Sequence, residues 1–348
     1  MSKQRLRTIL TTFLLGVCHS GFSQSEIGGG EQPHLSLDSK GIIRLVYGQG
    51  DKIFYSHSKD HGLSFSKPFL VAEVTKMHLG MTRGPQLASS KDYSIVTAMD
   101  QKGNIHAFQL DHKTEKWNSI KDVNDAEGSA PEGLMSITAD DVNHFYAVWL
   151  DLREDKKNNG IAFSTLTGKG SWSKNKIVYA SPDKTVCECC KPSVAVRDKN
   201  VSLMFRNWIN GSRDLHVITS TDGGLTFGSA TKLGNGTWKL KGCPMDGGGL
   251  LIDKNNGIHT AWQREGVIYY DQPNQAEIKI SDGRSCNLFG KEAPFITWQH
   301  DGQIYGRSLN GNNLTVGEGT AVTVVELTPE IFLAAWEKDE KILYRKLE

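Results

Sequence analysis

The sequence predicts an all-β protein with the architecture of a β-propeller, a ring of four-stranded blades. Helical periodicity is nearly absent, and short alternating runs rich in Val, Ile, Tyr and Phe are separated by Gly, Asn and Asp turns along the whole chain. One hairpin pattern also recurs at a fixed spacing. A unit of this kind cannot bury both of its faces alone, and radial stacking of several units supplies the missing core.

Five hairpins share a large apolar residue at the end of one strand, a polar turn, and an isoleucine six positions later. They are Tyr47 with Ile53, Met99 with Ile105, Trp262 with Ile268, Trp298 with Ile304, and Trp336 with Ile342. Two further hairpins have longer turns, from Trp149 to Ile161 and from Phe205 to Ile218. Seven units predict seven blades, the last closed by a strand near the mature N-terminus. Six blades remain the alternative, because the last two units are compact and the glycine run 28–30 makes a poor closing strand.

The N-terminal segment has the pattern of a secretory signal. Lys3, Arg5 and Arg7 precede an apolar run over residues 9–17 and a small-residue cleavage site at 21–23. We therefore expect a signal peptide over residues 1–23, a single propeller domain over 24–348, and a secreted or periplasmic protein. A lipoprotein anchored through Cys18 is the less favoured alternative, because the bulky Val17 stands where lipid-attachment signals prefer a small residue.

The composition after signal removal argues against two classes of partner. The chain has 40 Lys and Arg against 39 Asp and Glu, and removal of the three basic residues of the signal leaves 37 against 39. This balance does not favour a nucleic-acid partner. No later stretch approaches the roughly 20 apolar residues of a membrane-spanning helix, so we expect no integral membrane segment after signal cleavage.

Two segments, Ser58 to Phe65 and Ser220 to Phe227, fit the pattern Ser-x-Asp-x-Gly-x-Ser/Thr-aromatic. The Asp carboxylate of such a turn can accept backbone N–H groups, and the glycine gives the backbone the freedom that the turn needs. On this pattern the chain resembles the sialidase-like superfamily of Asp-box (BNR-repeat) propellers. The resemblance implies the propeller fold and places both turns between the third and fourth strands of a blade, opposite the ligand site.

The resemblance also implies an exo-acting glycoside hydrolase of sialidase type. Such a site uses three arginines to clamp a sugar carboxylate, a Tyr nucleophile paired with Glu, and an Asp acid/base. The Arg-x-Pro signature expected before the first Asp box is Glu31-Gln32-Pro33 here, whereas Arg83-Gly84-Pro85 has the pattern one blade late. Tyr269 or Tyr270 near Glu265 is the candidate nucleophile pair. These departures leave catalysis unproven.

Loop position selects the candidate site residues. The loop that enters the first strand of a blade and the turn that joins its second and third strands lie on one face, where sites usually form. The predicted catalytic set on that face is Arg83, Asp151, Arg153, Arg206, Arg213 and Asp246. The alternative is structural: the arginines form ion pairs with Asp151 and Asp214, or cap loop carbonyl groups.

Four cysteines lie at matching entry positions of two adjacent blades. Cys187, Cys189 and Cys190 precede Pro192, and Cys243 precedes Pro244. One interpretation is a disulfide that ties the two entry loops, most simply from one of the three to Cys243. The other is a copper or zinc site on these four sulfurs, helped by His34 or Asp246.

These observations leave three classes of function open. The first is an exported propeller that binds or processes a glycan on its entry face. The second is a non-enzymatic module that binds another extracellular ligand, and the third is a copper or zinc protein built on the cysteines. Because propellers carry unrelated functions, the fold alone does not choose among them.

Overall fold

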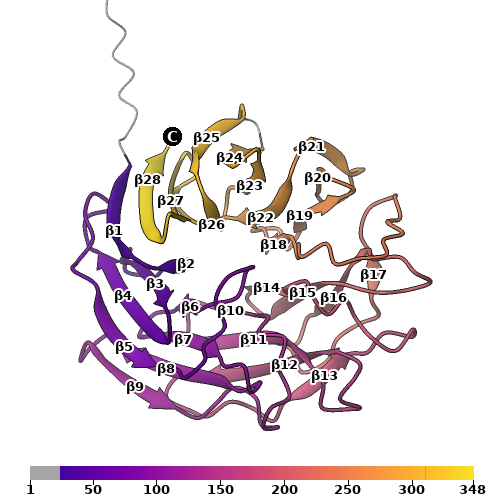
Figure 1. Ribbon diagram of the computed structural model, residues 1–348, viewed down its shortest axis with the longest axis horizontal. Coiled ribbons are helices and arrows are strands. Elements are labelled where there is room, and N and C mark those ends of the chain that lie inside the picture. The colour runs from indigo at the N-terminus through magenta and orange to yellow at the C-terminus, as the bar shows by residue number, and fades with distance from the viewer. Residues whose placement is uncertain (1–23, 310) are drawn as a thin grey trace, which may run out of the picture.

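The computed structural model describes residues 24–309 and 311–348, which form seven four-stranded antiparallel sheets arranged as a ring (Figure 1). Blade 1 is β2 (Glu31–Leu37), β3 (Ile43–Gln49), β4 (Lys52–Ser58) and β5 (Phe69–Glu73). Blade 2 is β6 (Gln86–Ser89), β7 (Tyr93–Met99), β8 (Ile105–Asp111) and β9 (Lys116–Ile120). Blade 3 is β10 (Met135–Ala139), β11 (His144–Asp151), β12 (Gly160–Thr167) and β13 (Lys176–Tyr179). Blade 4 is β14 (Ser193–Arg197), β15 (Asn200–Arg206), β16 (Leu215–Ser220) and β17 (Thr231–Lys232).

The remaining blades complete the ring. Blade 5 is β18 (Gly249–Ile252), β19 (Ile258–Arg264), β20 (Val267–Asp271) and β21 (Ile278–Asp282). Blade 6 is β22 (Arg284–Phe289), β23 (Phe295–His300), β24 (Gln303–Ser308) and β25 (Leu314–Glu318). Blade 7 is β26 (Thr320–Thr328), β27 (Ile331–Lys338), β28 (Lys341–Leu347) and the N-terminal β1 (Ser25–Gly29). The prediction of seven blades is confirmed. The predicted signal segment, with Cys18, lies outside the described residues.

The core lies between the blades, as one hydrophobic cluster at each of the seven blade interfaces. Alternate residues of a second strand belong to different clusters: in β11, Phe145 and Trp149 pack with blade 2, and Tyr146 and Leu150 pack with blade 4. This follows from the two-residue period of a strand. The side chains of the five apolar–isoleucine hairpins are at most 3% exposed. The spacing of six positions between a large apolar residue and an isoleucine thus marks the turn between the second and third strands of a blade.

The ring closes by pairing of its two ends, as the sequence predicts. Strand β1 is antiparallel to β28, with Ser25 opposite Tyr344 and Gly29 opposite Lys341, and the two lie side by side in Figure 1. The glycine run has a steric reason, because a side chain at two of its positions would clash with Tyr47. A Cβ atom on Gly30 would lie 2.3 Å from Cδ2 of Tyr47, and one on Gly28 would lie 2.9 Å from its hydroxyl oxygen. The glycines are therefore needed because the ring of Tyr47 packs on their backbone.

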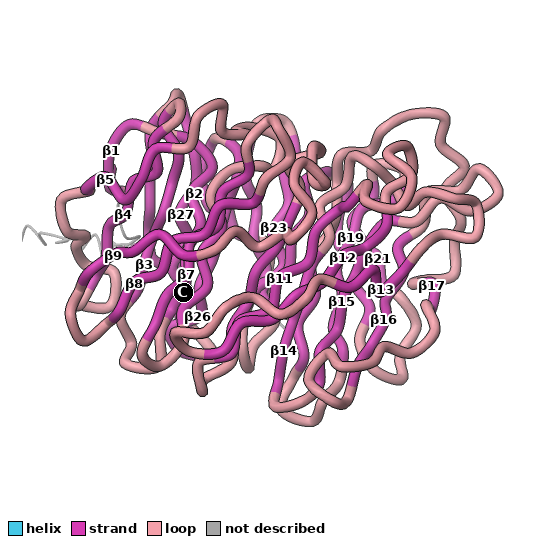
Figure 2. Tube along the Cα trace, turned by 90° about the horizontal axis from the view of Figure 1, so that it is seen from below, coloured by secondary structure: helices cyan, strands magenta, loops and turns pink. Residues whose placement is uncertain are grey.

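The strands have two ends, which define two faces of the ring (Figure 2). We call one of them the entry face. It carries the loops that lead into the first strand of each blade and the turns between the second and third strands. The opposite face carries the remaining turns, including those after β4 and β16 that have the Asp-box pattern. Within the described residues, no helix is long and apolar enough to span a membrane.

The two Asp-box turns have the same hydrogen bonds. The Oδ1 atom of Asp60 accepts the N–H of Ser64 at 3.0 Å, and Asp222 accepts the N–H of Thr226 at 2.9 Å. The aromatic residue of each turn packs on the third strand of the preceding blade. Phe227 lies 5.2 Å from Phe163, and Phe65 lies 4.8 Å from Tyr344 between ring centroids. These turns stabilise blade contacts on the face opposite the entry loops.

We expect Gly30→Ala to lower the free energy of unfolding by about 2 kcal/mol, because the added methyl group overpacks the backbone against Tyr47. Urea denaturation measures the change. Gly29→Ala at the neighbouring position is the matched control, because its Cβ would lie 3.3 Å from the flexible end of Gln49 and at an ordinary 3.7 Å from the backbone oxygen of Glu340. Equal losses in the two variants would contradict the role assigned to Tyr47.

Candidate functional site

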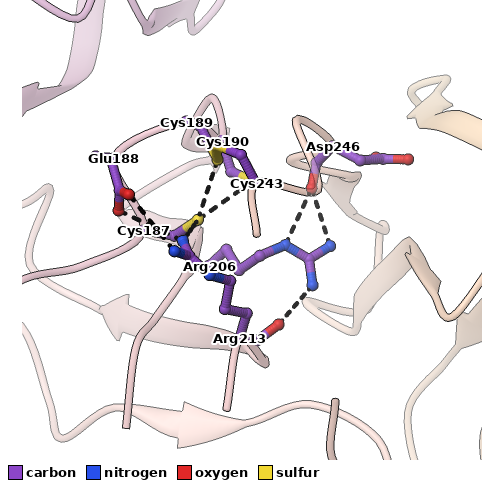
Figure 3. The surroundings of a disulfide bond; sticks show 8 residues. All are labelled: Cys187, Glu188, Cys189, Cys190, Arg206, Arg213, Cys243 and Asp246. Atoms are coloured by element: carbon purple, nitrogen blue, oxygen red, sulfur yellow. Dashed lines mark hydrogen bonds and ion pairs between the residues drawn. A yellow bond between two sulfur atoms is a disulfide. The ribbon is translucent and has the colours of Figure 1, made fainter. Parts of the chain in front are cut away.

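The entry loops of blades 4 and 5 form an additional layer over their blades. The long turn between β15 and β16 pairs with the loop before β18, through a bridge between Ser212 and Lys239, and Asn207 pairs with Val186. A disulfide joins Cys189 to Cys243, with Cα atoms 6.1 Å apart (Figure 3). The structure thus forms the predicted link between the two loops.

Two thiols lie beside this disulfide. The Sγ atom of Cys187 is 3.5 Å from Sγ of Cys189 and 3.6 Å from Sγ of Cys190, and Nη1 of Arg213 lies 2.9 Å from it. Hydrogen bonds from Cys190 and from the backbone of Cys189, together with the charge of Arg213, outweigh burial and lower the pKa of the Cys187 thiol to about 6. Burial raises the pKa of the Cys190 thiol well above its usual range. The two thiols are therefore electrostatically unequal.

The cysteines fit the metal interpretation only in part. The sulfur atoms of Cys187, Cys189 and Cys190 lie within 4.8 Å of one another. However, Cys189 and Cys243 are bonded to each other, so two thiol sulfurs remain for an ion. A structural zinc site takes four ligands. With the disulfide formed, copper or zinc would lack a complete sulfur set at this place.

Arg206 and Asp246 have structural contacts. The buried guanidinium of Arg206 donates to the backbone oxygens of Asp246, Arg213 and Gln263, at 2.7 to 3.2 Å. The Asp246 carboxylate accepts the N–H groups of Gly248 and Cys286, each at 3.3 Å, and points away from the sulfur atoms in Figure 3. Burial raises the pKa of this carboxyl group. For Arg206, the predicted alternative of a carbonyl cap holds.

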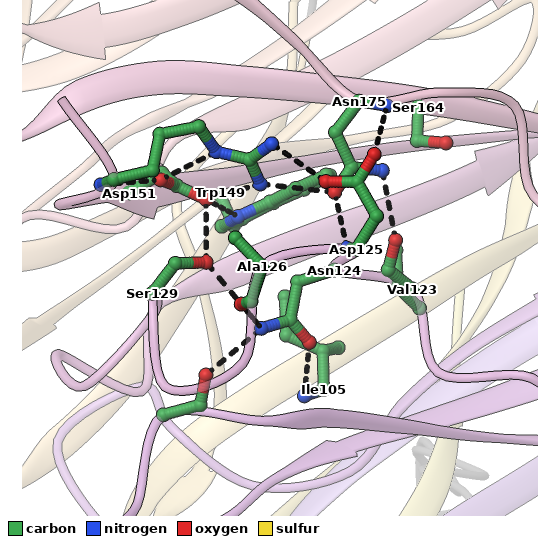
Figure 4. A network of polar contacts seen from close by, with 12 residues as sticks. Ile105, Val123, Asn124, Asp125, Ala126, Ser129, Trp149, Asp151, Ser164 and Asn175 are labelled. Carbon is green, nitrogen blue, oxygen red and sulfur yellow. Dashed lines mark hydrogen bonds and ion pairs between the residues drawn. The ribbon is translucent and has the colours of Figure 1, made fainter.

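Arg153 and Asp151 form an ion pair, and Figure 4 shows the larger polar network around Asp151. The guanidinium makes two hydrogen bonds of 2.8 Å to the Asp151 carboxylate, and it also donates to Asp125 at 2.7 Å and Asn175 at 2.9 Å. Asp151 further accepts from Trp149 at 2.8 Å. The ion pair proposed as the structural alternative is therefore present, and it ties the turn of blade 3 to neighbouring loops.

The structure does not assemble the arginine clamp of a sialidase. Arg206 and Arg213 lie together, but Arg83 donates to the backbone oxygen of Glu132 at 2.7 Å, and Arg153 is held in its own network. The candidate tyrosines are also engaged. Tyr270 is 1% exposed with its hydroxyl group 2.6 Å from Nδ1 of His259, and Tyr269 stacks on Trp262. The hydroxyl group of Tyr270 is therefore not a free nucleophile.

Sequence reasoning missed Lys191, which lies in the entry loop of blade 4, two residues before β14. Its Nζ atom is 3.3 Å from Oε1 of Gln86, across the ring in blade 2. Among residues 24–309 and 311–348, no carboxylate lies within the 4.0 Å ion-pair distance of this ammonium. Burial lowers the pKa of Lys191 to about 8. Burial and the Lys191 charge lower the pKa of His34 to about 3, so this neighbouring ring is neutral.

A large cavity lies on the other face of the ring. It has a volume of about 800 Å³ and lies at the far ends of the inner strands, where residues such as Ala139, Arg197 and Ile252 line it. The Asp-box turn of blade 4 contributes Asp222. None of the predicted catalytic residues lines this cavity.

Known structures share the architecture. A catalytically inactive variant of virginiamycin B lyase from Staphylococcus aureus, in complex with quinupristin, is 12% identical, with TM-score 0.51, over 94% of this chain and 99% of the lyase. The protein YCF48 bound to D1 peptide is 9% identical in sequence, with TM-score 0.57, and the match covers 94% of this chain and 96% of YCF48. The SapL1 lectin in complex with α-methyl fucoside is 11% identical in sequence, with TM-score 0.51, and the match covers 84% of this chain and 96% of the lectin.

The chain is a seven-bladed β-propeller of this structural class. At identities near 10% the likeness shows the fold alone, and it confirms the fold that the Asp-box resemblance implies. No protein-family model and no curated protein sequence matches the chain. The propellers named above have a lyase, a lectin and a peptide-bound protein among them, so the function must be argued from this chain's own residues.

We expect Arg153→Lys to lower the free energy of unfolding by about 1–3 kcal/mol, because a lysine cannot replace the forked contacts to Asp151, Asp125 and Asn175. Chemical denaturation tests this. Lys156→Ala, on the same turn but exposed, is the control. An unchanged stability of Arg153→Lys would show that the network is not the role of this arginine.

We expect the free energy of unfolding to rise between about pH 8 and pH 10.4, because the unfolded chain keeps a proton on Lys191 that the folded protein releases. The rise is on the order of 3 kcal/mol, from a pKa lowered by roughly two units. Denaturation at several pH values, with Lys191→Met and Lys199→Met compared, isolates this contribution from other groups. Parallel pH profiles for the wild type and Lys191→Met would contradict it.

Proposed function

We propose that this chain is an exported binding propeller that takes an acidic carbohydrate at the mouth of its central channel, with Lys191 as the cation that receives the ligand's negative group. The observation that carries the proposal is the ammonium of Lys191, which is partly buried, donates to the neutral amide of Gln86 and has no carboxylate partner in the described chain. A buried cation without a counter-charge is unfavourable. An anionic ligand would relieve that cost.

The position of Lys191 suits a ligand that enters along the ring axis. The residue lies two positions before β14, the inner strand of blade 4, whereas Gln86 and His34 belong to β6 and β2, the inner strands of blades 2 and 1. The loop of blade 5 approaches closely from the other side, since a Cβ atom on Gly247 would lie 2.0 Å from the backbone oxygen of Lys191. The blade 5 loop thus packs on the backbone of Lys191, and Gln86 of blade 2 accepts from its ammonium.

The surroundings favour a sugar over a simple anion. Trp208 and Trp238 lie in the entry-face layer, and both are partly exposed. Their rings are held by guanidinium groups, Arg213 at 4.0 Å from Trp208 and Arg206 at 5.4 Å from Trp238. A rigid aromatic ring with one accessible face can pack on the apolar face of a pyranose. The resemblance to sialidase-like propellers points to the same ligand class.

Binding without hydrolysis is supported by the state of the predicted catalytic groups. Each of the four arginines is engaged by protein atoms, and Tyr270 is buried against His259. A clamp needs guanidinium groups that are free to pair with a substrate carboxylate. A single lysine can bind a carboxylate as a point charge, but it supplies neither a nucleophile pair nor an acid/base for glycoside cleavage.

Glycan-array binding of the mature chain, followed by titration calorimetry, tests the proposal. We expect acidic sugars to bind and Lys191→Met to weaken that binding at least tenfold, because the variant keeps the side-chain length and removes the charge. Lys199→Met is the matched control, since Lys199 is exposed at the opposite end of the same blade.

Three outcomes would overturn the proposal. In the first, neutral sugars bind as tightly as acidic ones. In the second, Lys191→Met and Lys199→Met lose equal affinity for acidic sugars. In the third, the wild type releases the free sugar from a sialoside. The first two would remove the role of Lys191, and the third would restore the hydrolase.

A further inference from the structure

We propose that the entry loops of blades 4 and 5 contain a thiol–disulfide exchange site, in which Cys187 attacks Cys189 of the Cys189–Cys243 disulfide, Cys243 leaves as a thiolate, and Cys190 then resolves the new bond. The proposal does not depend on the sugar-binding role of Lys191, although the two share Arg213 and Trp208 and Lys191 directly follows Cys190. The ligand chemistry of the exchange site is that of thiols and disulfides.

The sulfur geometry carries the proposal. Cys187 lies 3.5 Å from the disulfide sulfur of Cys189, and Cys190 lies 3.6 Å from Cys187 (Figure 3). Attack requires no large movement, because both thiols and one disulfide sulfur belong to a single four-residue segment. Cys187 and Cys190 are at most 1% exposed, whereas Cys243 is exposed on the surface. The leaving sulfur is therefore the one that faces solvent.

The electrostatic environment prepares Cys187 as the nucleophile. Nη1 of Arg213 lies 2.9 Å from its sulfur, and the guanidinium is held between Glu188 and the ring of Trp208. The thiolate is the attacking species, and a thiol with a pKa of about 6 is mostly ionised at neutral pH. The raised pKa of Cys190 keeps the second thiol protonated until the first step is complete. Cys187 and Cys190 also have the Cys-x-x-Cys spacing typical of dithiol redox pairs.

The exchange is balanced without an external oxidant or reductant. In the first step a bond forms between the sulfurs of Cys187 and Cys189, the bond from Cys189 to Cys243 breaks, and its electron pair leaves on Cys243, which takes a proton from solvent. In the second step Cys190 loses its proton and attacks Cys187, and Cys189 leaves as a thiolate. The protein begins and ends with one disulfide and two thiols in this cluster.

The exchange would change the connection between two blades. In the starting form a covalent bond holds the loop before β18 to the loop before β14. In the product the disulfide lies within residues 187–190, and the blade 5 loop keeps only its non-covalent contacts, such as the bridge from Ser212 to Lys239. The exposed thiol of Cys243 is then available to an external thiol or disulfide.

Capture of Cys243 in the folded protein tests the exchange. The mature chain is incubated with a maleimide under native conditions, and the disulfides and labelled cysteines are mapped by mass spectrometry after an acid quench. We expect labelling of Cys243 together with a Cys187–Cys189 or Cys187–Cys190 disulfide, because alkylation traps the exchanged form. The rate should rise as the pH passes through about 6, as Cys187 ionises.

Two variants and a control make the test decisive. Cys187→Ser should slow the labelling of Cys243 at least tenfold, and Arg213→Met should slow it at neutral pH while leaving the disulfide in place. Cys286→Ala, which removes a buried thiol of blade 6 outside the cluster, should label at the wild-type rate. Acidic-sugar binding by Cys187→Ser would remain, so failure of the exchange and failure of the sugar site are distinguishable.

The proposal is overturned if the wild type shows only the Cys189–Cys243 disulfide after prolonged capture, a result that needs no variant to fold. It is also overturned if Cys187→Ser labels as fast as the wild type. Stoichiometric zinc or copper in the purified protein, with four reduced cysteines after chelation, would replace it with the metal interpretation.

Discussion

The structure depends on the fact that the second strand of each blade packs against two neighbouring blades at once. Because strand side chains alternate between faces, Trp149 of β11 packs towards blade 2 and Leu150 towards blade 4. No blade can bury both sets of side chains alone, so the ring must close. Pairing of β1 with β28 completes it, and Gly30 lets the backbone approach Tyr47 at that point.

A closed ring leaves its loops free to specialise. On the opposite face, Asp60 and Asp222 fix similar turns whose aromatic residues pack on the preceding blade. On the entry face between blades 4 and 5, the loops are instead joined by a disulfide and by the backbone bridge between Ser212 and Lys239. The entry face thus has a locally rigid part on a scaffold whose own stability comes from the blade interfaces.

The sequence predicts the fold well because its signals are local. The spacing of Tyr47 and Ile53 marks a hairpin wherever it occurs, but the glycine run looked unfavourable until the position of Tyr47 was known. The site is less predictable, because contacts between distant residues decide which groups are free. Arg153 is engaged by Asp125, and Lys191 faces Gln86, a residue 105 positions away. Neither relation has a signature in the spacing of the chain.

The cations of the entry face differ in what neutralises them, and this difference assigns their roles. Arg206 is surrounded by backbone oxygens, and Arg213 lies against Glu188 and the Cys187 sulfur. Lys191 has one amide oxygen, from Gln86, and no charged partner among the described residues. Protein groups therefore already occupy the donors that a sialidase would use for its substrate. Of Arg206, Arg213 and Lys191, the lysine is the one without such a partner in the described chain, so we expect an anionic ligand to gain more free energy there than at either arginine.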